Sequence, residues 1–403
     1  MSGPRLLVVL SAAVAAALAA PAVAAAARPP SVDDAAAAIV VDGGDGAVML
    51  QKDPDKRHAI ASTTKLMTAL LTLERARPSQ VFTAPPYRAQ PAESKIDLRK
   101  GERMRVADLL EALLLESAND AAETLAEGIA GSRAGFVDLM NRRAAELRLA
   151  HTSYANPIGL DEPDNYSTAR DLSSLAVRLL RRPRFARIVD MPEAVLESGS
   201  HRRVVDNRND LVRRYSFVDG VKTGHTIDAG YVLVGAARGR SGASVVSVVL
   251  GEPSEAARDS DTLALLRWGL GRFRRSRVLD PDRVVARSDV KYRDERAELV
   301  PRTPLVLTVR RGERVSRRVR APEELEGPLD ARERVGSVTV LLDGKPVRRV
   351  ALVTAAKVPG AGPLRVLFSP LGVPLTMLFV FSVLGAAALI LRRTRAGQRT
   401  VRE

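Results

Sequence analysis

Residues 59–74, AIASTTKLMTALLTLE, place a Ser-Thr-Thr-Lys cluster directly before an apolar run. Lys65 follows Ser62 by three residues, and leucine and methionine then recur with roughly helical spacing. In one interpretation Ser62 caps a helix and Lys65 is an exposed lysine behind it. In the other, the helix places a hydroxyl and an amine on one face, one turn apart, so that the amine can act as the base of the hydroxyl.

Two further clusters bear on this choice. Ser117-Ala118-Asn119 lies between two helical patterns in residues 106–131, VADLLEALLLESANDAAETLAEGIAG. Lys222-Thr223-Gly224 lies in residues 218–239, VDGVKTGHTIDAGYVLVGAARG, which we expect to form strands. Each cluster alone is a weak signal, because short Ser and Lys patterns arise often by chance. Together, their order, spacing and predicted contexts favour the interpretation in which Lys65 serves Ser62.

The surrounding pattern predicts an α+β domain. A Gly/Asp-rich turn at residues 42–46 divides residues 37–53 into a β-hairpin, and residues 243–251 form a strand after those that carry the Lys-Thr-Gly cluster. The helices predicted besides those already described are 136–149, 167–180 with Ser167 or Thr168 as its cap, and 262–270. Strands at both ends with helices between them predict an antiparallel sheet that is covered by helices and joins the two ends of the domain.

A different pattern begins near residue 277. Short Val-rich segments alternate with charged ones up to residue 357, and Asp343-Gly344 between two alternating runs is a strong hairpin signal. This part is predicted to be a small all-β domain. The chain has no cysteine, so an exported protein of this sequence has to stabilise its domains by burial alone.

Both ends of the chain carry membrane-targeting signals. Residues 1–27 contain Arg5, an apolar stretch and small residues near position 24, which predicts a secretory signal peptide; an uncleaved anchor is the alternative. Residues 373–391 carry no charge and are long enough to span a bilayer. The arginines that follow, in residues 392–403, predict a cytoplasmic tail and therefore an extracytoplasmic body.

Charge and composition narrow the class of partner. The formal net charge is +15, which suits a surface near anionic lipid or anionic wall polymer. The arginine runs at residues 181–187 and 272–277 are interpreted as solvated surface rather than a nucleic-acid site, because export takes the chain away from nucleic acid. Four scattered histidines and no cysteine argue against a catalytic metal.

The three clusters carry a resemblance to a known family. S-x-x-K, a second Ser/Asn cluster and K-T-G are a signature of β-lactamases and penicillin-binding proteins. Residues 36–270 resemble a serine-type D-alanyl-D-alanine carboxypeptidase, a low-molecular-mass penicillin-binding protein. The match extends to ASTTKLMTALL, LLLESANDAAETLAE, NPIGLDEPDNYSTARDL and VDGVKTGHTIDAGYVLVGAA. The second cluster, S-A-N, is similar to the S-x-N pattern of these carboxypeptidases, whereas class A β-lactamases typically have S-D-N. The anchor differs, because it is a full span where the family often has an amphipathic helix.

This resemblance, with the composition, predicts a division of the chain. After the signal peptide we expect a catalytic domain at residues 28–273 and the all-β domain at residues 274–358. A linker at residues 359–372, a transmembrane helix at residues 373–391 and the basic tail then follow. Nothing in the all-β segment indicates whether it lifts the catalytic domain from the membrane or binds a partner.

The resemblance implies catalytic roles for three residues. Ser62 would attack the carbonyl between two terminal D-alanines, Lys65 would be its base, and Ser117 would relay a proton to the leaving nitrogen. A lysine can act as a base only when its amine is neutral, and burial or a nearby cation lowers the pKa of a lysine. Lys222 could be that cation.

Substrate-binding roles are implied for the remaining positions. Asn119 would hydrogen-bond the substrate amide or the lysine base, while Lys222 and Thr223 would hold the terminal carboxylate. Gly224 would leave room for the substrate backbone along the strand. The backbone N–H groups of the nucleophile and of His225 would form the oxyanion hole.

We therefore expect a membrane-anchored enzyme that removes the terminal D-alanine from peptidoglycan stem peptides through an acyl-enzyme on Ser62. It would need no cofactor or metal, and β-lactams would acylate it. The alternatives are a DD-endopeptidase or β-lactamase-like hydrolase of the same fold, and a catalytically silent cell-wall scaffold protein.

Overall fold

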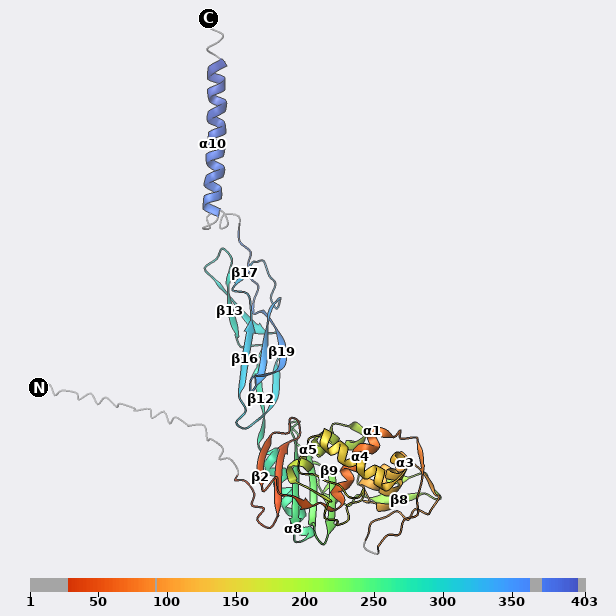
Figure 1. Cartoon of the computed structure of the whole chain (residues 1–403). Coiled ribbons are helices and arrows are strands. Elements are labelled where there is room, and N and C mark those ends of the chain that lie inside the picture. The colour runs from red at the N-terminus through yellow and green to blue at the C-terminus, as the bar shows by residue number, and fades with distance from the viewer. Residues whose placement is uncertain (1–27, 91–92, 363–371, 398–403) are drawn as a thin grey trace, which may run out of the picture.

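The computed structural model describes residues 28–90, 93–362 and 372–397. An α+β domain, an elongated all-β domain and a C-terminal helix follow one another along the chain (Figure 1). The predicted signal peptide, residues 1–27, and the last residues of the predicted basic tail, 398–403, lie outside the described residues.

A five-stranded antiparallel sheet forms the centre of the α+β domain. Its strands lie in the order β2-β1-β11-β10-β9. Ile39 of β1 pairs with Val248 of β11, so the first and last strands of the domain are neighbours, as predicted. The bounds are β1 Ala37–Asp42, β2 Val48–Lys52, β9 Val218–Thr226, β10 Gly230–Arg238 and β11 Ser244–Glu252.

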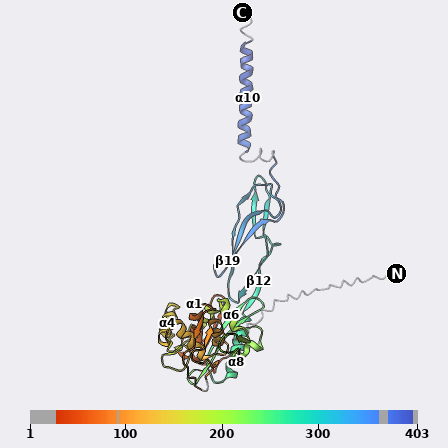
Figure 2. The ribbon, with the colours of Figure 1, turned by 90° about the vertical axis from the view of Figure 1, so that its right-hand side faces the viewer.

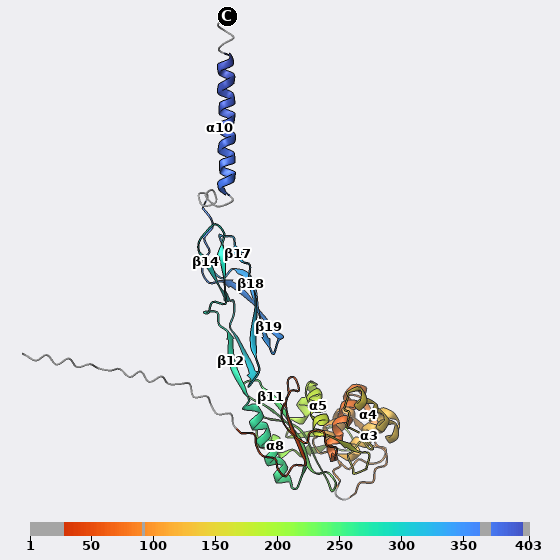
Figure 3. The same cartoon turned by 60° about the vertical axis from the view of Figure 1, so that its left-hand side comes forward.

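Helices cover both faces of this sheet (Figures 2 and 3). Alternate strand residues point to opposite faces, and so Ile39 and Val248 belong to the larger core while Val40 and Val249 belong to the smaller one beneath α8. The helices are α1 Lys65–Arg75, α2 Val106–Leu114, α3 Asn119–Ala130, α4 Arg133–Glu146, α5 Ala169–Leu180, α6 Pro183–Val189, α7 Asp210–Arg214 and α8 Glu255–Leu270.

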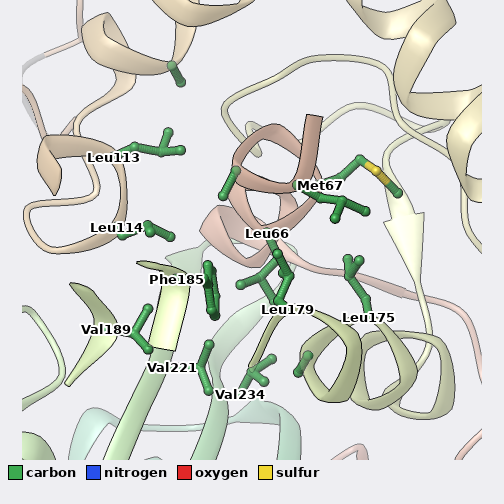
Figure 4. Close-up of a cluster of buried hydrophobic side chains, with 14 of the residues drawn as sticks. Leu66, Met67, Leu113, Leu114, Leu175, Leu179, Phe185, Val189, Val221 and Val234 are labelled. Carbon is green, nitrogen blue, oxygen red and sulfur yellow. The ribbon is translucent and has the colours of Figure 1, made fainter. Parts of the chain in front are cut away.

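The larger core fixes α1 against the sheet. Figure 4 shows Leu66 of α1 among side chains of α5 and α6, above Val221 of β9 and Val234 of β10. Leu66, Val234 and Leu179 are fully buried. Burial of one such side chain stabilises a fold by about 1.5–3 kcal/mol. The first turn of α1, which carries Lys65, is thereby held beside the strand that carries Lys222.

Helix starts follow capping chemistry that the sequence signals only in part. Thr168 caps α5, as one of the two predicted caps, and its hydroxyl accepts a hydrogen bond from Asp171 N. The helix predicted at residues 262–270 begins seven residues earlier, because Ser254 caps it by accepting from Ala257 N. Helix α4 likewise begins before the predicted residue 136, after the cap Ser132.

Short strands flank the helices and were not predicted. They form three two-stranded sheets that connect the helical segments. The pairs are β3 His58–Ala59 with β6 Tyr166–Ser167, β4 Val81–Thr83 with β5 Arg103–Arg105, and β7 Glu193–Leu196 with β8 Arg203–Asp206.

The all-β domain contains the predicted hairpin. Asp343 and Gly344 adopt positive φ angles of 45° and 79° between β18 and β19. Arg310 joins the domain to the sheet, with its Nη1 2.6 Å from Asp42 Oδ2. The strands are β12 Phe273–Leu279, β13 Ala286–Val290, β14 Arg296–Pro301, β15 Leu305–Arg310, β16 Val315–Arg320, β17 Glu324–Leu325, β18 Arg334–Leu342 and β19 Lys345–Thr354.

The C-terminal helix α10, Gly372–Gly397, includes the predicted span at residues 373–391. Within the described part of the chain it is the one helix long and apolar enough to cross a membrane. Its large apolar side chains are exposed; Phe379 and Phe381 are 70% and 67% accessible.

The buried Glu252 at the end of β11, near the half-buried Asp261 of α8, predicts a pH-dependent stability. Burial, followed by the nearby charge of Asp261, raises the pKa of Glu252 to about 7. Asp34 raises this pKa further and Lys52 opposes it. Because this pKa is raised in the folded state, protonation of Glu252 favours folding. Its contribution to the free energy of unfolding is fully present below about pH 4.5, the usual Glu value, and is lost as the pH rises through about 7.

We therefore expect Glu252→Gln to remove this loss. Between pH 5 and pH 8, the free energy of unfolding should fall in the wild type by on the order of 2 kcal/mol more than in the variant. Urea unfolding at the two pH values measures this difference. Glu127→Gln, which removes an exposed carboxylate, is the matched control. Parallel pH profiles for the wild type and Glu252→Gln would contradict the assignment.

Candidate active site

Ser62 lies in a 3₁₀ turn, η1 Ala61–Thr64, that leads directly into α1. No side-chain oxygen caps either η1 or α1, so the N-cap interpretation of Ser62 is not what the structure shows. Instead, Lys65 Nζ lies 2.9 Å from Ser62 Oγ, within hydrogen-bond distance. The hydroxyl and the amine are neighbours one helical turn apart, which is the geometry of a nucleophile and its base.

The Lys65 side chain is completely buried. Burial lowers the pKa of Lys65 well below its usual value, and the positive charge of Lys222 lowers it further. Glu93 of the loop before β5, and Glu123 and Asp120 of α3, oppose this effect. A neutral amine can accept the proton of a hydroxyl, whereas an ammonium cannot.

A loop after α4 fixes the lysine from the other side. Lys65 Nζ donates to Ile158 O at 2.6 Å. The Asn156 side chain shapes this loop, since its Oδ1 accepts hydrogen bonds from the N–H groups of Ile158 and Gly159. Gly159 has a φ of +95°, and a Cβ there would lie 2.0 Å from Ala61 O. Sequence reasoning did not assign this role; the available signal was the Asn-Pro-Ile-Gly sequence itself.

The second cluster occupies the turn between α2 and α3. Ser117 is 6% exposed and has a φ of +63°, an uncommon conformation for a residue with a side chain. Such conformations cost of order 1–3 kcal/mol and concentrate at functional sites. Asn119 begins α3, and its Nδ2 donates to Glu93 Oε2 at 2.6 Å. Asn119 therefore contacts a carboxylate that sequence reasoning did not identify.

The third cluster lies on β9, the edge strand of the sheet. Lys222 is 1% exposed, and its Nζ donates to Thr223 O at 3.0 Å. A Cβ added at Gly224 would lie 2.8 Å from Ser62 N, so the strand approaches the nucleophile so closely that only glycine fits. The exposed His225 ring stacks on Tyr231 of β10, with 4.0 Å between the ring centroids.

One cleft of about 320 Å³ is lined by residues of the first two clusters and by His225, which directly follows the third. Ser62, Asn119 and His225 line this cleft, whereas the side chains of Lys65, Ser117, Lys222 and Thr223 are buried. No group of three or more His, Asp or Glu residues in the described ranges is placed to hold a metal ion. The full lining is Ser62, Gln90, Glu93, Ser94, Asn119, Ile158, Gly159, Leu160, Asp161, His225, Thr226 and Ile227.

Two arginines that sequence reasoning missed act on Lys222. Burial lowers the pKa of Lys222 to about 7, and the charges of Arg208 and then Arg258 contribute, with Glu116 opposing them. Neither arginine lies in one of the three motifs, which is why sequence reasoning did not identify them. A carboxylate that enters this cation-rich environment would restore the charged form of Lys222.

This predicts that the binding of a carboxylate-terminated ligand weakens as the pH rises above about 7, because Lys222 loses its proton. Saturation binding of a non-hydrolysable D-Ala-D-Ala mimic across pH 5.5–9 measures this dependence. Lys222→Arg, which stays charged, should flatten the profile. An affinity independent of pH in the wild type would contradict the assignment.

Comparison with known proteins identifies the family of the chain. A family model described as D-alanyl-D-alanine carboxypeptidase matches residues 23–254, and one described as penicillin-binding protein 5, C-terminal domain, matches residues 273–360. DacC of Escherichia coli is 31% identical over 339 residues, covering 79% of this chain and 82% of that protein. DacF of Bacillus subtilis is 30% identical over 310 residues, covering 74% and 79%. Both relatives are named D-alanyl-D-alanine carboxypeptidases.

Solved structures show the same fold. Penicillin binding protein 5 of Haemophilus influenzae is 30% identical with a TM-score of 0.59, covering 82% of this chain and 99% of that one. The Streptomyces K15 DD-transpeptidase is 30% identical with a TM-score of 0.56, covering 60% and 99%. The predicted α+β fold, followed by a small β domain, is thus confirmed. The chain belongs to the D-alanyl-D-alanine carboxypeptidase family.

Proposed function

We propose that this protein removes the terminal D-alanine from peptidoglycan stem peptides through an acyl-enzyme on Ser62. The observation that carries the proposal is the 2.9 Å contact between Ser62 Oγ and the buried Nζ of Lys65. The membership of the family supports the substrate class. The roles of the individual residues rest on their placement at the cleft.

Acylation begins when Lys65 Nζ takes the proton of Ser62 Oγ. The oxygen attacks the carbonyl carbon of the penultimate D-alanine, and the backbone N–H groups of Ser62 and His225 bind the resulting oxyanion. Removal of one such donor commonly costs about 2.7–4 kcal/mol of transition-state stabilisation. The C–N bond then breaks, the proton passes from Lys65 through Ser117 to the leaving nitrogen, and D-alanine departs.

In deacylation, water is the nucleophile and Ser62 Oγ is the leaving group. A water molecule loses a proton to Lys65 and attacks the ester carbon, and Ser62 Oγ leaves and regains its proton. The product is the shortened peptide with a free carboxylate. A β-lactam would acylate Ser62 by the same attack but leave a long-lived ester.

Specificity for a free C-terminus follows from the cations near β9. Lys222 with Thr223 would hold the terminal carboxylate, and Arg208 and Arg258 add positive potential there. Gly224 leaves space for the substrate to lie along the strand. A peptide without a free carboxylate would leave these groups unpaired, which penalises its binding.

The direct test is the release of D-alanine from a pentapeptide that ends in two D-alanines, with detergent-solubilised full-length protein. The proposal predicts stoichiometric release that a fluorescent penicillin blocks by covalent labelling. Absence of both activities would favour the alternative of a silent wall scaffold. Product analysis on cross-linked muropeptides separates carboxypeptidase from endopeptidase activity, and the lifetime of the penicillin adduct separates both from a β-lactamase.

We also propose that α10 anchors the protein with its catalytic domain outside the cell membrane. The support is the apolar, exposed surface of residues Val373–Arg392, with the arginine-rich sequence behind it. The signal peptide predicted at residues 1–27 would direct export. The protein should fractionate with membranes in alkaline carbonate, and a stop codon after residue 362 should release it into the soluble fraction.

A further inference from the structure

Glu93 connects the loop before β5 to the second catalytic cluster. Its Oε2 accepts a hydrogen bond from Asn119 Nδ2 at 2.6 Å and another from the Tyr87 hydroxyl. Its Oε1 accepts from Gln90 N at 2.9 Å. Glu93 and Asn119 both line the cleft to which Ser62 is exposed. Neither the sequence motifs nor the roles proposed above include Glu93.

The loop around Glu93 is fixed to the start of α3. Asn119 N donates to Ser94 O at 2.8 Å. The Asp120 carboxylate accepts from Leu98 N at 2.9 Å and from Ile96 N at 3.2 Å. These bonds hold the loop backbone against the first turn of α3, so that the Glu93 carboxylate has a defined position beside Asn119.

The chemistry of this contact determines how the Asn119 amide is oriented. An ionised carboxylate can only accept hydrogen bonds, so it has to face the NH₂ group of an asparagine. The hydrogen bonds of Tyr87, Gln90 and Asn119 lower the pKa of Glu93 despite partial burial, which keeps it ionised at neutral pH. Asn119 Oδ1 is therefore directed away from Glu93 and presents an acceptor.

We propose that Glu93 is a positioning residue: by accepting from Nδ2 it fixes the orientation in which the Asn119 amide meets the bound peptide. This inference rests on the proposed function, because it concerns a substrate-binding group of that same cleft. The contact with Glu93 uses one N–H of Nδ2 and leaves the second N–H and Oδ1 available for further hydrogen bonds.

Glu93 has a second, electrostatic effect that supplies a specific readout. Its negative charge raises the pKa of Lys65, against the larger effects of burial and of Lys222. Glu123 and Asp120 of α3 act in the same direction as Glu93. Removal of the Glu93 charge should therefore lower the pKa of Lys65. In a plot of acylation rate against pH, the acid limb, where the rate falls because Lys65 is protonated, should then move to lower pH.

The test compares Glu93→Gln with the wild type in full-length, detergent-solubilised protein. Acylation by benzylpenicillin and hydrolysis of diacetyl-L-Lys-D-Ala-D-Ala are followed from pH 5 to 9. Glutamine can also donate to Asn119 and allows the amide to turn over, so we expect kcat/KM at its maximum to fall by about tenfold or more. The acid limb should move to lower pH at the same time, which general damage to the fold would not produce.

Two variants of the same network separate the two effects. Glu93→Asp keeps the charge, so its acid limb should stay at the wild-type pH even if its maximum falls. Tyr87→Phe removes one donor to Glu93 and leaves the charge, so its maximum should fall by a few-fold with the limb unmoved. Tyr87→Phe also keeps the inference testable if Glu93→Gln fails to fold.

Asp97→Asn is the matched control. Asp97 lies on the same loop with an exposed carboxylate and a φ of 57°, which asparagine tolerates. It should behave as the wild type. A Glu93→Gln profile that coincides with that of Asp97→Asn, in an active enzyme, would overturn the inference. A wild type that neither hydrolyses the peptide nor reacts with penicillin would overturn the proposed function as well, which is a distinguishable result.

Discussion

Ser62→Ala is expected to abolish both the release of D-alanine and covalent labelling by penicillin. The hydroxyl is the only group of residue 62 that forms the ester, and its loss should lower kcat/KM by about 10⁴-fold or more, as in other serine acyl transferases. The side chain contributes its contact with Lys65 and no cap to either η1 or α1, so the fold should be retained. D-alanine release and fluorescent penicillin labelling on a gel measure the two effects.

Ser174→Ala is the matched control for this experiment. Ser174 is exposed on α5 and donates to Arg170 O within its own helix. Its removal should leave both activities unchanged. If Ser62→Ala protein retained turnover above about one part in a thousand, the nucleophile would have to be another residue.

Lys65→Met is expected to separate catalysis from stability. Methionine fills a similar volume but cannot accept a proton, so acylation by benzylpenicillin should slow by about 10³-fold, within the range of general-base catalysis. A buried amine has to be desolvated, whereas a methionine does not, and this gain offsets the loss of the hydrogen bond to Ile158 O. Thermal unfolding should therefore occur at the wild-type temperature or above it.

The rate of penicillin acylation, by stopped-flow, and the midpoint of thermal unfolding, by calorimetry, measure these two quantities. Lys95→Met, on an exposed lysine of the loop after Glu93, is the control and should affect neither. A Lys65→Met enzyme with a normal acylation rate would refute the base assignment. A variant that loses both rate and stability would show that Lys65 is structural.

The sequence predicts the central sheet because its signals are local. Alternation and turn residues mark β1, β2 and the Asp343-Gly344 hairpin, and the apolar periodicity marks the first turn of α1. The bounds that were missed depend on hydrogen bonds with no pattern of their own. Helix α8, capped by Ser254, begins seven residues before the apolar periodicity that predicted it. The strands β7 and β8 are short and pair only with each other.

The same distinction applies to the cleft. The three motifs place Ser62, Lys65 and Lys222 in the correct contexts, since each is a short local pattern. The sequence does not show that Glu93 meets Asn119, or that Ile158 O accepts from Lys65, because these contacts join residues 26 and 93 positions apart. The charge of Arg258, on α8, acts on the pKa of Lys222 although the two residues are far apart in the sequence. Contacts and charge effects between residues far apart in the sequence can therefore be identified only from the structure.

The account depends above all on an uncharged amine beside Ser62. The most direct test is a titration of the Lys65 amine by NMR, in protein labelled with ¹³C at lysine Cε and with Lys65→Met used to assign the resonance. We predict that Lys65 titrates well below the usual lysine value of 10.5. A Lys65 amine that keeps its proton up to about pH 10.5 would contradict the mechanism, because the base would then be charged throughout the physiological pH range.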